Sequence, residues 1–167
     1  PDDQWQLPPA VPAPGPVRFV YAGGVFAEKG LVAALSAFTR IEAEFPGACR
    51  MEVFGSGDAQ LMREITVTPG AVVHGEVSSA ELRAFLSRHR CVGLAVLADT
   101  QRYRLIGTNL TKLYEYLAMG MPVIVSESGE VGAFVRKSGT GLVVAGAQDI
   151  DGIASAMRQF LTDETLV

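Results

Sequence analysis

Residues 111–126, with the sequence TKLYEYLAMGMPVIVS, constrain the fold more than any other stretch of the chain. Apolar side chains recur at the spacing of one helix face, at Leu110, Leu113, Tyr114, Leu117 and Ala118. Gly120 and Pro122 then end the helix. Residues 123–125 are all β-branched, which is typical of a strand covered on both faces. The stretch therefore predicts a helix that leads into an inner strand of a parallel sheet.

The same alternation of strand and helix patterns runs along most of the chain. Strands are predicted at residues 17–22, 50–54, 71–73, 91–97, 123–125 and 141–144. Further helices are predicted at residues 31–41, 59–65, 80–88, 130–137 and 150–161, the third of them opened by a Ser78–Glu81 capping box. This order indicates an α/β fold, a doubly wound, mostly parallel, six-stranded Rossmann-like sheet with helices on both faces.

The first 16 residues differ from the rest. They contain six prolines and no periodic apolar pattern, so residues 1–16 are predicted to be a linker and residues 17–167 a single domain. Because the chain starts abruptly in this segment, we expect it to be a piece of a longer protein.

Composition excludes several classes of function. The net charge of −4 argues against a nucleic-acid-binding surface, and no apolar run is long enough to span a bilayer. Cys49 and Cys91 each open an apolar run and are interpreted as buried free thiols in a reducing compartment. No metal-ligand spacing, nucleophile elbow or P-loop is present in the sequence.

Ligands of such sheets bind beyond the carboxyl ends of the strands. After the first strand the sequence reads GGVFAEKG, so Gly23 and Gly24 could lie under a phosphate with Lys29 beside it. A tight turn with an exposed lysine is the alternative. Lys112 and Glu115, three residues apart on the predicted helix, could likewise form an ordinary surface ion pair.

Three other features have ordinary explanations that stay open. Arg102 and Arg104 precede the 111–118 helix and could be solvated loop residues, and His74 could be structural. The sequence FGSGD at 54–58 is half of a dinucleotide fingerprint, but Gln60 stands where a small residue is required. A simple turn is the ordinary explanation of this stretch, and an NAD-dependent oxidoreductase domain built around Gly55–Gly57 is the alternative function. A flavodoxin-like signalling module, which needs clustered aspartates, is a third.

Taken in order, the motifs resemble the C-terminal, donor-binding half of the group 1 (family 4) retaining glycosyltransferases, which are built from two Rossmann-like domains. The resemblance rests on YAGGVFAEKG at 21–30, MEVFGSGD at 51–58, VVHGEVSSAEL at 72–82, KLYEYLAMGMPVIVS at 112–126 and GTGLVV at 139–144. It covers residues 17–163.

The resemblance implies a role for each matching residue. Glu115 would bind the ribose hydroxyls and Lys29 the diphosphate, above the Gly23–Gly24 turn. Thr108, Asn109 and Leu110 would cap the distal phosphate, and His74, Gly75, Glu76 and Val77 would border the base. The family often has an arginine at the position of Gly24 and a glutamate at that of Gly107. We therefore expect Lys112, with Arg102 or Arg104, to supply the missing positive charge.

The implied function is binding of a nucleotide-diphosphate sugar, UDP- or GDP-linked, for retaining transfer to a glycan or lipid-linked acceptor. Capsule, lipopolysaccharide or exopolysaccharide assembly is the implied pathway. The implied partner is a missing N-terminal Rossmann domain, without which this chain should bind donor but not transfer sugar. No cofactor, metal or nucleic acid is expected. The expected location is the cytoplasm, and a peripheral membrane association through the missing domain stays open.

Overall fold

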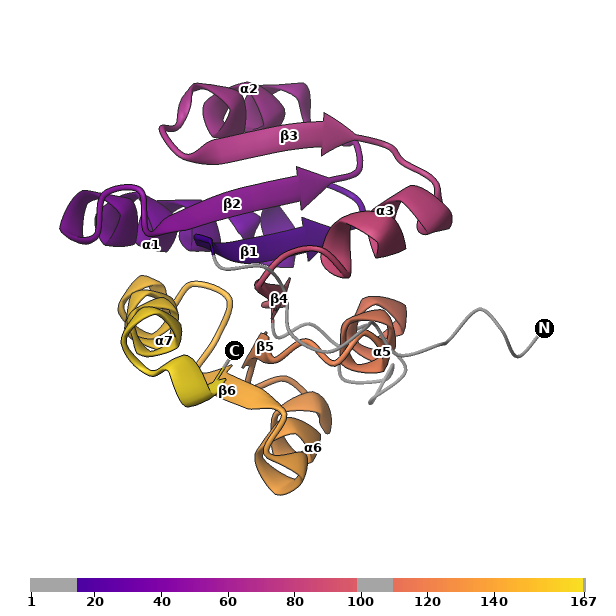
Figure 1. The fold of residues 1–167 in the computed structure, drawn as a ribbon, viewed down its shortest axis with the longest axis vertical. Coiled ribbons are helices and arrows are strands. Elements are labelled where there is room, and N and C mark those ends of the chain that lie inside the picture. The colour runs from indigo at the N-terminus through magenta and orange to yellow at the C-terminus, as the bar shows by residue number, and fades with distance from the viewer. Residues whose placement is uncertain (1–14, 99–109, 167) are drawn as a thin grey trace.

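A computed structural model describes residues 15–98 and 110–166 of the chain. Within these residues, parallel strands form one six-stranded sheet (Figure 1). The strands are β1 Val17–Ala22, β2 Cys49–Phe54, β3 Ala71–Gly75, β4 Cys91–Ala95, β5 Val123–Ser126 and β6 Gly141–Val144. Their order is β3-β2-β1-β4-β5-β6, and every neighbouring pair is parallel. The predicted doubly wound α/β fold is therefore confirmed.

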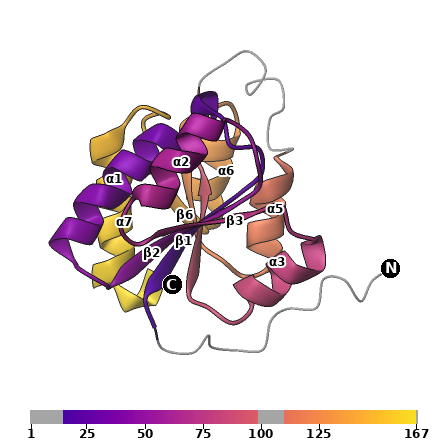
Figure 2. The ribbon, with the colours of Figure 1, turned by 90° about the horizontal axis from the view of Figure 1, so that it is seen from above.

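Helices cover both faces of this sheet. They are α1 Leu31–Glu44, α2 Ala59–Val67, α3 Ser79–Leu86, α5 Thr111–Ala118, α6 Val131–Ser138 and α7 Ile150–Thr162, with 3-10 turns η2 Ala27–Lys29 and η3 Glu164–Leu166. Figure 2 shows α1, α2 and α7 on one side of the sheet and α3 and α5 on the other. The buried side chains form two clusters that divide in the same way, with α6 on the side of α3 and α5.

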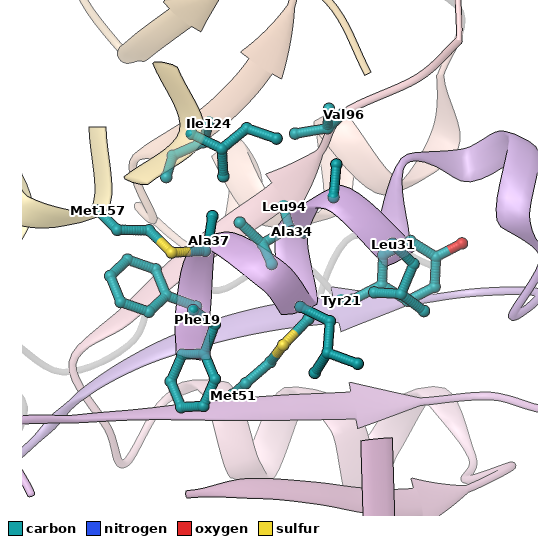
Figure 3. Close-up of a cluster of buried hydrophobic side chains, with 14 of the residues drawn as sticks. Phe19, Tyr21, Leu31, Ala34, Ala37, Met51, Leu94, Val96, Ile124 and Met157 are labelled. Atoms are coloured by element: carbon teal, nitrogen blue, oxygen red, sulfur yellow. The ribbon is translucent and has the colours of Figure 1, made fainter. Parts of the chain in front are cut away.

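The larger cluster lies between the sheet and helices α1, α2 and α7. Figure 3 shows Phe19, Met51 and Leu94 of the sheet packed around α1. The α1 residues that face them include Ala34 and Ala37, whose small side chains let the helix approach the strands closely. This core fixes the position of the turn that connects β1 to α1.

The smaller cluster holds α5 against the other face. A Cβ on Gly93 of β4 would lie 2.3 Å from the Tyr116 ring, so this glycine makes the room for the ring. The Tyr116 hydroxyl accepts a 2.8 Å hydrogen bond from the Ala22 N–H, at the carboxyl end of β1. Tyr116 thereby ties α5 to the strand end where ligands of such sheets bind.

Most element boundaries differ from the prediction by a residue or two. The strand predicted at 91–97 ends at Ala95, because Leu97 forms 2.8 Å hydrogen bonds with the Ser126 hydroxyl through both its N–H and its carbonyl oxygen. The strand predicted at 71–73 continues to Gly75. The capping box of Ser78 and Glu81 is present, and α3 begins directly after it.

Both cysteines are buried free thiols, as the sequence predicted. Burial raises the pKa of Cys49 and of Cys91 to about 12, so neither is a reactive thiolate at neutral pH. Of the proline-rich segment predicted as a linker, residues 1–14 lie outside the described part of the chain.

Candidate functional site

A cleft of about 660 Å³ opens at the carboxyl ends of β1 and β2. It lies where the order β3-β2-β1-β4 reverses the direction of the chain connections, the usual ligand position in doubly wound sheets. The ends of β1 and β2, the segments that follow β3 and β4, and residues of η2, α3 and α5 contribute to it. The lining residues are Ala22, Gly23, Gly24, Lys29, Phe54, Gly55, Ser56, Glu76, Val77, Ser79, Leu82, Leu97, Leu110, Thr111, Lys112 and Glu115.

Two lysine ammonium groups flank the turn that follows β1. A Cβ placed on Gly23, which has a φ of +133°, would lie 3.5 Å from Lys112 Nζ. A Cβ placed on Gly24 would lie 3.1 Å from Lys29 Nζ. The two glycines therefore leave backbone exposed between two amines, and the residues predicted to hold a phosphate come together here.

The Lys112 amine is buried and lacks a hydrogen-bond acceptor among the described residues. It lies 3.9 Å from the centre of the Tyr21 ring, in a cation–π contact. The Tyr21 hydroxyl donates a 2.6 Å hydrogen bond to the Gly24 carbonyl oxygen, so one tyrosine supports both the amine and the turn. Burial, together with the nearby Lys29 charge, lowers the pKa of Lys112 to about 7, and Glu115 opposes the shift.

Glu115 lies on α5 one turn after Lys112 and lines the same cleft as Lys29. The helix begins at the cleft, and no side chain of the described residues caps it. The Leu113 N–H bonds the Leu110 carbonyl oxygen, and the N–H groups of Thr111 and Lys112 have no backbone partner among the described residues. The start of α5, the Glu115 carboxylate and the amines of Lys29 and Lys112 therefore border the same cleft.

The predicted base-side residues divide into two pairs. Glu76 and Val77 line the cleft, and the Ser56 hydroxyl bonds the Glu76 carboxylate. His74 and Gly75 are not among the lining residues. His74 Nε2 lies 2.7 Å from a carboxylate oxygen of the buried Glu52, and the Gly75 carbonyl accepts a hydrogen bond from the Gly55 N–H.

Four predicted site residues precede α5 in the sequence. Arg102, Arg104, Thr108 and Asn109 lie outside the described residues, so their predicted roles stay predictions. Leu110, the last residue of that series, does line the cleft.

The glycines of the half-fingerprint are explained by packing. A Cβ on Gly55 would lie 2.1 Å from the Gly23 carbonyl oxygen, and one on Gly57 would lie 2.1 Å from that of Val25. Val25 and Gly57 also form a parallel β-bridge. Two neighbouring strand-to-helix turns thus touch through their backbones, which accounts for Gly55-Ser56-Gly57 without a dinucleotide.

Sequence reasoning missed Tyr21, which supports Lys112 from behind the cleft, and the lining residues Phe54 and Ser56. Tyr21 had a recoverable signal, since it is an aromatic residue placed two positions before Gly23 at a strand end. Phe54 and Ser56 flank Gly55 but carry no chemical pattern of their own. Within residues 15–98 and 110–166, no helix is long and apolar enough to cross a membrane, and no cluster of His, Cys, Asp and Glu could hold a metal ion.

A protein-family model described as "Glycosyl transferases group 1" matches residues 16–163. The chain is 27% identical over 165 residues to a glycogen synthase of Mycobacterium tuberculosis, a match that covers 96% of this chain and 37% of that protein. The chain therefore spans little more than a third of this curated relative.

Solved structures show the same fold. The C-terminal domain of a group 1 glycosyl transferase (LpcC) from Francisella tularensis has a TM-score of 0.73 at 14% identity, covering 98% of this chain and 88% of that one. Anabaena Alr3699/HepE, solved in complex with UDP and glucose, has a TM-score of 0.66 at 13% identity, covering 91% of this chain and 40% of that one.

Proposed function

The chain belongs to the group 1 glycosyl transferases, and we propose that its cleft binds the nucleoside diphosphate of an activated sugar donor. The observation that carries the proposal is the Lys112 amine, which is buried at the cleft with no acceptor among the described residues. A buried ammonium group without a partner is costly, and an anion in the cleft would supply that partner.

The diphosphate would lie over the Gly23–Gly24 turn. Lys29 and Lys112 approach this turn from two sides, and the start of α5 adds backbone N–H groups. Amines and helix N-termini together form the usual surroundings of a bound phosphate.

The ribose would lie next to α5. The carboxylate of Glu115 can accept hydrogen bonds from two neighbouring hydroxyl groups, and it borders the same volume as both lysines. The base would then reach the wall formed by Phe54, Glu76 and Val77. The structural relative that was solved with UDP supports a uridine donor, one of the two that the sequence resemblance implies.

The role of these groups in sugar transfer would be electrostatic. Transfer releases a nucleoside diphosphate, and Lys29, Lys112 and the α5 N-terminus would stabilise its developing charge. A preceding Rossmann-like domain, connected through the proline-rich residues 1–16, would bind the acceptor and complete a retaining enzyme. The 167 residues would then bind donor without transferring sugar. Assembly of surface or storage polysaccharide in the cytoplasm, where nucleotide sugars occur, fits this role.

Calorimetry with UDP, GDP, ADP and CMP tests the proposal. We expect the chain to bind UDP or GDP more tightly than CMP, because the second phosphate reaches the lysines. Lys112→Met should weaken binding of the diphosphate by about 10- to 150-fold, the range for a charged hydrogen bond. Lys137→Met, which removes an exposed lysine of α6, is the matched control and should bind as the unaltered chain does. Equal affinity for CMP and UDP, or an unaffected Lys112→Met variant, would refute the proposal.

A further inference from the structure

Glu52 is a buried carboxylate in the middle of β2 that the cleft does not use. Its side chain is 1% exposed and forms an ion pair with Arg18 of β1. Its second oxygen lies 2.7 Å from His74 Nε2, on β3. Since a carboxylate only accepts, the histidine nitrogen donates this hydrogen bond. A buried charge is tolerated only when it is paired, and Arg18 and His74 pair this one. The hydrogen bond to Glu52 holds the imidazole ring in one orientation.

The imidazole in turn lies flat against an aromatic side chain. The His74 and Phe54 ring centres are 4.2 Å apart and the rings are 5° from parallel. Phe85 of α3 places its edge on both rings, at 5.1 Å from Phe54 and 5.4 Å from His74. We call Phe54, His74 and Phe85 the aromatic stack. One end of this stack, Phe54, lines the cleft.

The backbone after His74 leads to the same wall. The Gly75 carbonyl oxygen accepts a 2.7 Å hydrogen bond from the Gly55 N–H, and the next residue, Glu76, bonds the Ser56 hydroxyl. Gly55, Ser56 and Glu76 all line the cleft. A rotation of the His74 ring would therefore displace the Phe54 ring, which stacks on it. It would also shift Glu76, which lies two residues further along the chain.

We propose that His74, held by Glu52, is a positioning residue for the nucleoside side of the cleft and does not itself contact the donor. The proposal rests on the proposed function, since it assigns this wall to the base and ribose. It replaces direct contact by His74, which the family resemblance implied, with an indirect role. The lysines that would hold the diphosphate lie on other elements, η2 and α5, and are independent of the stack.

Calorimetry with UDP and with inorganic pyrophosphate separates the two sides of the cleft. His74→Leu removes both the hydrogen bond and the ring contact. We expect it to weaken UDP binding by about five- to tenfold, the loss expected for one hydrogen bond or ring contact, and to leave pyrophosphate binding unchanged. His74→Gln keeps an N–H donor for Glu52 and should lose less UDP affinity than His74→Leu.

His89→Gln is the control. His89 contacts the Phe85 ring at 4.4 Å and bonds the Phe85 carbonyl oxygen, but it touches neither Phe54 nor Glu52 in the contacts of the described residues. It should bind both ligands as the unaltered chain does. The proposal is overturned if both His74 variants bind UDP normally, or if pyrophosphate binding falls by the same factor as UDP binding. If His74→Leu does not fold, normal UDP binding by His74→Gln alone overturns the proposal. Failure of the unaltered chain to bind either ligand would instead refute the proposed function.

Discussion

The amine of Lys112 lies 3.9 Å from the centre of the Tyr21 ring, with α5 and the end of β1 held together around it. The ring face attracts a cation but offers no hydrogen-bond acceptor, so the contact holds the amine in place without satisfying it. Because the Tyr21 hydroxyl also bonds the Gly24 carbonyl, Lys112 and the Gly23–Gly24 turn share one support.

Lys112→Met should stabilise the free chain while it weakens diphosphate binding. Burial lowers the pKa of Lys112 from 10.5 to about 7, so below pH 7 folding buries an ammonium group. Replacing that group with an apolar side chain should raise the free energy of unfolding by about 1–3 kcal/mol at pH 6. Urea denaturation measures the difference, which should shrink between pH 7 and 10.5 as the unfolded lysine also loses its proton. A less stable variant at pH 6 would contradict the burial argument.

Donor binding should depend on pH through the same amine. Only the protonated form attracts a diphosphate, so above pH 7 UDP must bind together with a proton. Affinity should fall by up to about tenfold per pH unit above pH 8, where the UDP phosphates are already fully ionised. Calorimetry in two buffers of different ionisation enthalpy detects the proton. Lys112→Arg keeps its charge and should remove the slope. A slope that persists in this variant would assign the proton to another group.

Glu115→Ala should remove the hydrogen bonds that the ribose hydroxyls would donate to the Glu115 carboxylate. We expect UDP affinity to fall by about 1.5–3 kcal/mol, or roughly 10- to 150-fold. The unaltered chain should prefer UDP to its 2′-deoxy analogue, and the variant should bind the two equally. A preference that survives the substitution would show that another residue binds the ribose.

Gly93→Ala should destabilise the fold through Tyr116. The added methyl group would lie 2.3 Å from the buried ring, and moving the ring would strain the hydrogen bond from Ala22 to the Tyr116 hydroxyl. We expect a loss of about 1–3 kcal/mol in the free energy of unfolding. Gly146→Ala is the control, because a Cβ there has no neighbour within 4 Å. Equal stability of the two variants would show that α5 adapts freely.

Periodicity was enough to predict the sheet, because the apolar spacing of helices and strands is local in sequence. The same reasoning placed Lys29, Lys112 and Glu115 at one edge of that sheet, and the structure does bring them to one cleft. It could not predict that Tyr21 lies beneath Lys112, since that contact joins segments far apart in the chain.

Two patterns were ambiguous for physical reasons. Glycine is needed at positions 55 and 57 because a Cβ there would collide with the backbone of the neighbouring turn. A bound nucleotide that approached the backbone closely would require glycine at the same positions. His74 is followed by cleft residues in sequence, but its side chain turns to Glu52, whose burial no local pattern reveals.

The contact between the turns after β1 and β2 limits how the shape of the cleft could be altered. Val25 and Gly57 form a β-bridge, and the Asp58 N–H donates a hydrogen bond to the Val25 carbonyl oxygen. The backbone conformation of each loop therefore constrains that of the other. Randomising residues 23–25 alone would generate loops that collide with an unchanged neighbour. Exchanging residues 23–25 and 55–58 together, as one cassette from a single relative, would carry the matching shapes across. The two loops should therefore be exchanged as one unit when the cleft is engineered.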